Sequence, residues 1–138
     1  LVGDDYGVPT NLPWAVKFSN GLPISNVGNL RSMGLDLDKS LPYDLVLACH
    51  PTQLYEMSAY IIIFFYLIFF VKKYQKYVGQ ILFEYLFLAG FVRFLVEFIR
   101  LNPKYLFNLS GAQYISIVMM LLGSFYMWKY RQNTSRIH

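Results

Sequence analysis

Three long apolar stretches dominate the second half of the chain, over residues 51–71, 79–101 and 112–128. A helix rises 1.5 Å per residue, so about 20 residues cross the roughly 30 Å hydrocarbon layer of a bilayer. Lysines follow the first stretch and a proline follows the second, which is how such helices commonly end. The pattern predicts three transmembrane helices in an all-α polytopic membrane protein.

Residues 1–50 follow a different pattern. Four prolines interrupt the segment, and it has no helical periodicity. Asn20-Gly21 is a turn signal, and residues 14–18 alternate between apolar and polar like a short strand. We expect an irregular extramembrane segment over 1–50 with at most one hairpin, followed by a transmembrane bundle with a basic tail over 51–138.

The first apolar stretch carries a helix start signal, His50-Pro51-Thr52-Gln53. Proline suits the first helical position because its missing N–H would be unpaired there anyway. With His50 as the cap, Gln53 occupies the capping-box position, from which a side chain reaches back to the cap. Glu56 is the one charge within this stretch.

The second apolar stretch holds three charges in its second half, Arg93, Glu97 and Arg100. At 3.6 residues per turn these positions share one helix face, and Gly90 lies on the same stripe. Between Gln80 and Ile99, thirteen Leu, Ile, Phe and Val residues favour insertion by roughly −4 to −8 kcal/mol, and each charge costs about +2.5 to +3.5 kcal/mol. The stripe is therefore predicted to face other helices or a polar cavity, where ionisable groups mark functional sites.

Composition agrees with a membrane protein, since 56% of the 138 residues are hydrophobic and only 14% are charged. The net charge of +4 gathers after apolar stretches, which suits membrane orientation rather than nucleic-acid binding. Cys49 is the only cysteine, so no internal disulfide can form and no paired-cysteine metal motif is present. We expect its thiol to be shielded rather than nucleophilic.

The basic residues also predict an orientation. One cluster follows the first stretch at Lys72, Lys73 and Lys76, and another follows the third at Lys129, Arg131 and Arg136. The positive-inside rule places both clusters, and thus the C-terminus, in the cytoplasm. Residues 1–50 and the 102–111 loop then lie on the outer face.

The charged residues predicted near the outer leaflet are Asp4, Asp5, Glu56, Arg93, Glu97 and Arg100. Two arginines at this depth suit a phosphate or carboxylate, because guanidinium offers a planar fork of donors. Alternatively, Arg93 and Glu97 form an i,i+4 ion pair that stabilises the bundle. Gln113 and Ser116 are expected to form hydrogen bonds between helices. These patterns predict an anion-binding membrane pocket without specifying a reaction.

Three co-linear motifs go further: GDDYGVPTNLPWAVKF at 3–18, HPTQLYE at 50–56 and GFVRFLVEFIR at 90–100, with a weaker LSGAQYIS at 109–116. Together they resemble the C-terminal half of the prolipoprotein diacylglyceryl transferase family. The resemblance implies part of a seven-helix enzyme of the bacterial inner membrane. Such an enzyme transfers the diacylglyceryl group of phosphatidylglycerol to the lipobox Cys of a prolipoprotein signal peptide, without metal or cofactor.

The resemblance also assigns roles to residues. It implies catalytic roles for Arg93, Glu97 and Asp4, with Arg93 at the phosphate and Glu97 orienting it. Substrate-binding roles fall on Arg93, Arg100, Gly7 and Tyr6. Supporting roles fall on His50, Gln53, Tyr55 and Glu56.

The sequence departs from the family pattern at several positions. Asp4 stands where a Glu is common, Ala89 stands where many members have Tyr, and Glu84 is an additional charge. The chain starts on LVGDDYG without a Met, so we expect a piece of a longer protein whose base histidine and first signature arginine precede Leu1. The alternatives are a non-catalytic anionic-lipid-binding or scaffolding membrane protein and, less favoured, a small transporter subunit.

Overall fold

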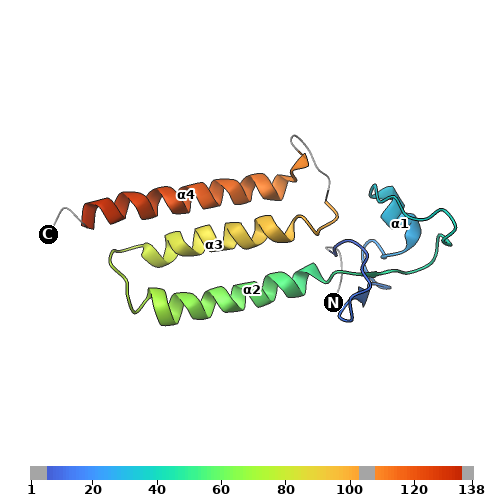
Figure 1. Cartoon of the computed structure of the whole chain (residues 1–138), viewed down its shortest axis with the longest axis horizontal. Helices are drawn as coiled ribbons and strands as arrows, with labels where there is room; N and C mark the ends of the chain where they lie inside the picture. The colour runs from blue at the N-terminus through green and yellow to red at the C-terminus, as the bar shows by residue number, and fades with distance from the viewer. Residues whose placement is uncertain (1–5, 103–107, 135–138) are drawn as a thin grey trace. The chain divides into compact units, whose positions relative to one another are not determined.

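The computed structural model describes residues 6–102 and 108–134, which fall into two compact units. The first unit comprises described residues 6–55 and 97–102, and the second comprises 56–96 and 108–134. The elements, shown in chain order in Figure 1, are β1 (Val16–Lys17), α1 (Val27–Ser32), β2 (Ala48–Cys49), α2 (Thr52–Tyr66), η1 (Leu67–Val71), α3 (Gln80–Val96) and α4 (Gly111–Thr134).

The first unit is built around a two-stranded antiparallel pair. Val16 of β1 pairs with Cys49 of β2. The buried core beside this pair consists of Tyr6, Phe18, Leu30 and Cys49. β1 lies inside the strand predicted over 14–18, but its partner is β2 rather than a strand directly after the Asn20-Gly21 turn.

A short helix, α1, was not predicted from the sequence. Asn26 caps it, because its side chain accepts a hydrogen bond from the Asn29 N–H at 2.8 Å. Val27 and Leu30 are three residues apart and are both fully buried, so they anchor one face of the helix. Six residues are too few for helical periodicity to stand out in the sequence.

The second unit contains the long helices. Two segments are long and apolar enough to cross a membrane, the 20 residues Thr52–Val71 and the 22 residues Gly111–Gln132. Only 17% of the most apolar window in each is buried within the chain, so most of these apolar side chains face outward. α3 has 17 residues and ends at Val96, five residues before the predicted end at 101. A third membrane span therefore stays a prediction.

The described members of the two basic clusters lie at the same end of the second unit, while Arg136 lies outside the described residues. The ring of Tyr77, which follows the lysines after η1, stacks on Tyr130 near the end of α4 at a centroid distance of 5.4 Å. Phe83 and Tyr126 stack at 4.8 Å one turn further in. The chain thus returns its basic residues to one side, as the orientation argument requires, while the cytoplasmic assignment of that side stays a prediction.

α3 and α4 run antiparallel at close range because glycine occupies two of their contact points. A Cβ on Gly90 would lie 2.8 Å from the Ser116 carbonyl oxygen, and one on Gly123 would lie 2.7 Å from that of Phe83. Small residues at such positions let two helix backbones approach, which drives helix association in membranes. This close contact sets the distance between the two helices.

Gly123→Ala should therefore destabilise the helical unit by about 1–3 kcal/mol, the usual cost of overpacking. Gly111→Ala is the matched control, since a Cβ at Gly111 has no atom within 4 Å. Unfolding of the purified chain in detergent micelles measures both variants. Equal stability of the two would show that the close approach of α3 and α4 is not limited by Gly123.

Candidate functional site

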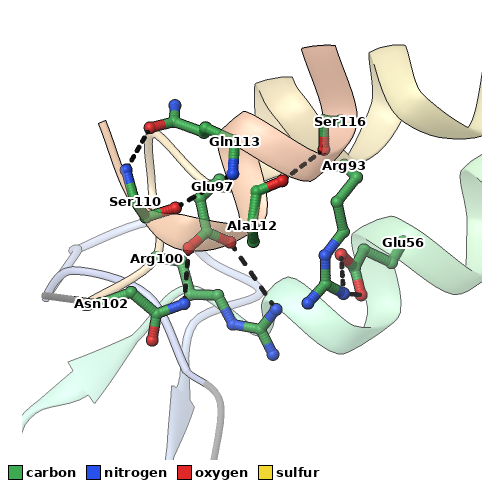
Figure 2. A network of polar contacts seen from close by, with 9 residues as sticks. All are labelled: Glu56, Arg93, Glu97, Arg100, Asn102, Ser110, Ala112, Gln113 and Ser116. Carbon is green, nitrogen blue, oxygen red and sulfur yellow. Dashed lines mark hydrogen bonds and ion pairs between the residues drawn. The ribbon is translucent and has the colours of Figure 1, made fainter. Parts of the chain in front are cut away.

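The main polar feature of the second unit is an ion pair between α2 and α3. Nη1 of Arg93, in the last turn of α3, lies 3.0 Å from Oε1 and 3.4 Å from Oε2 of Glu56 (Figure 2). The side chain of Glu56 is 15% exposed and that of Arg93 is 39% exposed. Among the described residues, every hydrogen bond of Arg93 uses Nη1. Its Nε and Nη2 donors therefore remain available for an anion.

Arg93 also lines a pocket of about 240 Å³ within the second unit. The other lining residues come from all three long helices and are uncharged: Tyr60, Ala89, Ala112, Ile115, Ser116 and Met119. A single guanidinium beside apolar walls suits an amphiphilic molecule with an anionic group. Sequence reasoning missed Tyr60, although it lies one helical turn after Glu56 and thus on the same face of α2.

A second charged cluster lies in the first unit, beyond the end of α3. Glu97 accepts a hydrogen bond from the Asn102 side chain through Oε1, and its Oε2 lies 3.9 Å from Nη1 of Arg100 (Figure 2). The side chains of Glu97 and Arg100 are only 1% and 4% exposed. Removing one partner would leave the other charge buried, so the pair must be kept together.

The predicted stripe of Arg93, Glu97 and Arg100 on one helix face is therefore wrong. The helix ends at Val96, and Arg100 forms a β-bridge with Gly7 instead of continuing it. The predicted Arg93–Glu97 ion pair is also wrong, because Arg93 pairs with Glu56 and Glu97 pairs with Arg100. Backbone pairing with a distant segment outweighs helix propensity at these positions.

Gly7 lies where three segments of the first unit meet. Its N–H donates to the His50 carbonyl at 2.9 Å, and the next N–H, of Val8, donates to the Ile99 carbonyl at 2.9 Å. A Cβ on Gly7 would lie 2.9 Å from that same Ile99 oxygen. Only glycine fits, so the structure supplies a packing reason for Gly7 beside the substrate role implied by the resemblance.

Two other residues singled out from the sequence, Tyr6 and Cys49, lie in the core of the first unit. Tyr6 is 3% exposed, stacks on Phe18 at 5.2 Å and donates to the Ile24 carbonyl at 3.3 Å. This position leaves Tyr6 little surface for a substrate. Cys49 is fully buried, and burial raises the pKa of its thiol to about 11, which confirms the shielded thiol. Asp4 lies outside the described residues.

The helix start motif is arranged differently from the prediction. α2 begins at Thr52, with Pro51 just before it. The Nδ1 atom of His50 lies 2.9 Å from the Tyr55 hydroxyl, so the His50 side chain forms a hydrogen bond with the first turn of α2. Gln53 also lies in the first turn of α2.

Gln113 and Ser116 do not link helices as predicted. Gln113 Oε1 accepts from the Ser110 N–H at 2.9 Å, while Ser110 Oγ accepts from the Gln113 N–H at 3.3 Å. This reciprocal capping box starts α4, and the Ser-x-x-Gln spacing could have revealed it. The Ser116 hydroxyl donates to the Ala112 carbonyl of its own helix at 2.8 Å.

Comparison with known proteins identifies the family. The family model described as prolipoprotein diacylglyceryl transferase matches residues 1–129. The chain belongs to the prolipoprotein diacylglyceryl transferase family. The resemblance found in its motifs is thereby confirmed. No solved structure matches the chain.

Several relatives are named phosphatidylglycerol–prolipoprotein diacylglyceryl transferase. One from Finegoldia magna is 32% identical over 127 residues, covering 92% of this chain and 41% of the relative. One from Fervidobacterium nodosum is 34% identical, covering 86% of this chain and 35% of the relative. One from Vibrio atlanticus is 33% identical, covering 92% of this chain and 40% of the relative. The chain thus spans about two fifths of the length of these transferases.

The ion pair connects two motifs of this transferase family member that the sequence presents separately. Glu56 ends HPTQLYE, and Arg93 lies within GFVRFLVEFIR. Their contact joins α2 to α3 and leaves part of the guanidinium facing the pocket. This arrangement makes Arg93 the strongest candidate among the described residues for binding an anionic substrate.

Gly7→Ala should loosen the contact between residues 7–8 and Ile99, because the new Cβ would press on a backbone oxygen. We expect protection of the Val8 amide against hydrogen exchange to fall by about 1–3 kcal/mol. Gly111→Ala is the control, since a Cβ at Gly111 has no atom within 4 Å. Exchange measured by mass spectrometry that is unchanged in Gly7→Ala would contradict the packing role.

Proposed function

We propose that this chain forms the phosphate-facing part of an enzyme that transfers the diacylglyceryl group of phosphatidylglycerol to the Cys thiol of bacterial prolipoproteins. One observation carries the proposal: Arg93, held by Glu56, lines an otherwise uncharged pocket with donors to spare. Family membership supplies the reaction class, and the relatives' names supply both substrates. The proposed location is the bacterial inner membrane, with several spans and a cytoplasmic C-terminus.

The proposed reaction needs a positive charge where Arg93 lies. The thiolate sulfur attacks the glyceryl carbon next to the phosphate, the carbon–oxygen bond breaks, and glycerol phosphate leaves with the electron pair. A guanidinium fixed beside the leaving phosphate stabilises the charge that develops there, and more strongly in a low-dielectric site than in water. Arg93 fulfils this role in our proposal.

Glu56 acts as a positioning residue in this scheme. It occupies Nη1 of Arg93 and thereby directs the remaining donors of the fork. It takes the orienting role that the sequence assigned to Glu97. In our proposal Glu97, Arg100 and Gly7 instead maintain the first unit, where their contacts with Asn102 and the Ile99 backbone lie.

A second candidate function is binding of an anionic lipid without catalysis. Two features of the pocket wall favour it. Arg93 is the one charged residue among those that line the pocket, and Ala89 fills the position at which many family members have Tyr. A binder needs only the guanidinium and the apolar wall. A transferase also needs a group that takes the thiol proton, so the two functions separate when transfer and binding are measured on the same protein.

The test uses a chimera in which residues 1–138 replace the aligned segment of the Finegoldia magna relative. Arg93→Ala should reduce diacylglyceryl transfer to a lipobox peptide by about 10²–10³-fold, the usual cost of losing one donor to a developing charge. Arg131→Ala, on the basic end of α4, is the matched control and should keep its activity.

Equal transfer by the Arg93→Ala and control chimeras would contradict the catalytic role. Phosphatidylglycerol binding that depends on Arg93, in a chimera that transfers nothing, would favour the lipid-binding function instead.

A further inference from the structure

A turn in the first unit exposes a tryptophan. The Ala15 N–H donates to the Leu12 carbonyl at 3.0 Å, which closes a turn with Trp14 near its tip. Trp14 is 55% exposed and Leu12 is 38% exposed. Both side chains would gain free energy by leaving water, so a lipid interface in contact with the turn would bury them favourably.

The indole of Trp14 is nevertheless fixed in place. Its Nε1–H donates to the Tyr55 hydroxyl oxygen at 2.8 Å, and that hydroxyl lies 2.9 Å from Nδ1 of His50. The indole N–H can only donate, so the Tyr55 oxygen accepts from it, and the same hydroxyl shares a second hydrogen bond with His50. Trp14 is thus the outer member of a hydrogen-bonded chain of three side chains.

The position of Tyr55 indicates how deep the three hydrogen-bonded side chains lie in the membrane. It is the fourth residue of the candidate span Thr52–Val71, so it lies about 4.5 Å along the helix from the start of the span. The boundary between hydrocarbon and headgroups is the region where Tyr and Trp side chains gather, with the ring in lipid and the polar atom toward water. A hydrogen bond of 2.8 Å holds the Trp14 indole at the same level as the Tyr55 hydroxyl.

We propose that the Leu12–Trp14 turn is a membrane-contact surface that lies in the headgroup layer where α2 begins. Its partner is the lipid interface itself, and the hydrogen bond to Tyr55 fixes the depth of the indole. The argument uses only the exposure of the turn, this bond and the position of Tyr55 in the span, so it is independent of the proposed transferase function.

Trp14 can report its own depth. The full chain carrying Trp128→Phe has Trp14 as its one tryptophan. It is placed in vesicles of phosphatidylcholine and phosphatidylglycerol in which the acyl chains carry bromine near the headgroup or near the bilayer centre. Iodide in the buffer serves as the aqueous quencher. The water-facing reference is Lys39→Trp in a Trp14→Phe/Trp128→Phe background, since Lys39 is exposed in a charged patch.

We expect bromine near the headgroup to quench Trp14 more than bromine near the centre, and iodide to quench it less than the reference. The emission of Trp14 should also be shifted to the blue of the reference. Iodide quenching equal to the reference, without quenching by brominated lipid, would overturn the proposal, because the turn would then face water or another protein. Stronger quenching from the bilayer centre would overturn the interfacial depth.

A second pair of variants tests the role of the hydrogen bond. Tyr55→Phe removes the acceptor of the indole N–H and should reduce the preference of Trp14 for quenching by shallow bromine. Tyr43→Phe removes a phenol from another exposed site of the same unit and should leave that preference unchanged. Equal quenching profiles in the two variants would overturn the claim that Tyr55 fixes the depth.

Discussion

The ion pair between Glu56 and Arg93 is the interaction on which the proposed site depends. A guanidinium within an apolar helix is costly unless it has a partner, and the carboxylate of a neighbouring helix provides one. The pairing links α2 to α3 through one nitrogen and leaves the other donors of Arg93 for a ligand. In our proposal, a residue that needs a partner for stability thereby also serves as the site for an anion.

The close approach of α3 and α4 builds the rest of that site. Gly90 and Gly123 bring the two backbones together, and the pocket lies beside this contact, with Ala89 and Ser116 in its wall. A low-dielectric surrounding strengthens the field of a guanidinium on a phosphate, and most of the pocket wall is apolar. Neighbouring small residues of α3 and α4 thus form the helix contact and the pocket wall.

Much of this organisation could be predicted from the sequence, because long apolar stretches mark helices and the family motifs mark Arg93 and Glu56. The residue at which α3 ends and the partners of the charged side chains could not be predicted. α3 stops at Val96 because the residues after it pair with Gly7, which lies near the opposite end of the sequence, and periodicity carries no information about such contacts. The pairing of Arg93 with Glu56 depends likewise on how two helices pack.

The central claim is that Glu56 acts on lipid binding through Arg93. A double-mutant cycle on the full chain in lipid nanodiscs tests it, with Glu56→Ala, Arg93→Ala and the double variant compared for affinity toward phosphatidylglycerol over phosphatidylcholine. The account predicts that Glu56→Ala weakens this preference in the parent chain and has no further effect once Arg93 is removed. Equal losses from Glu56→Ala in both backgrounds would contradict it.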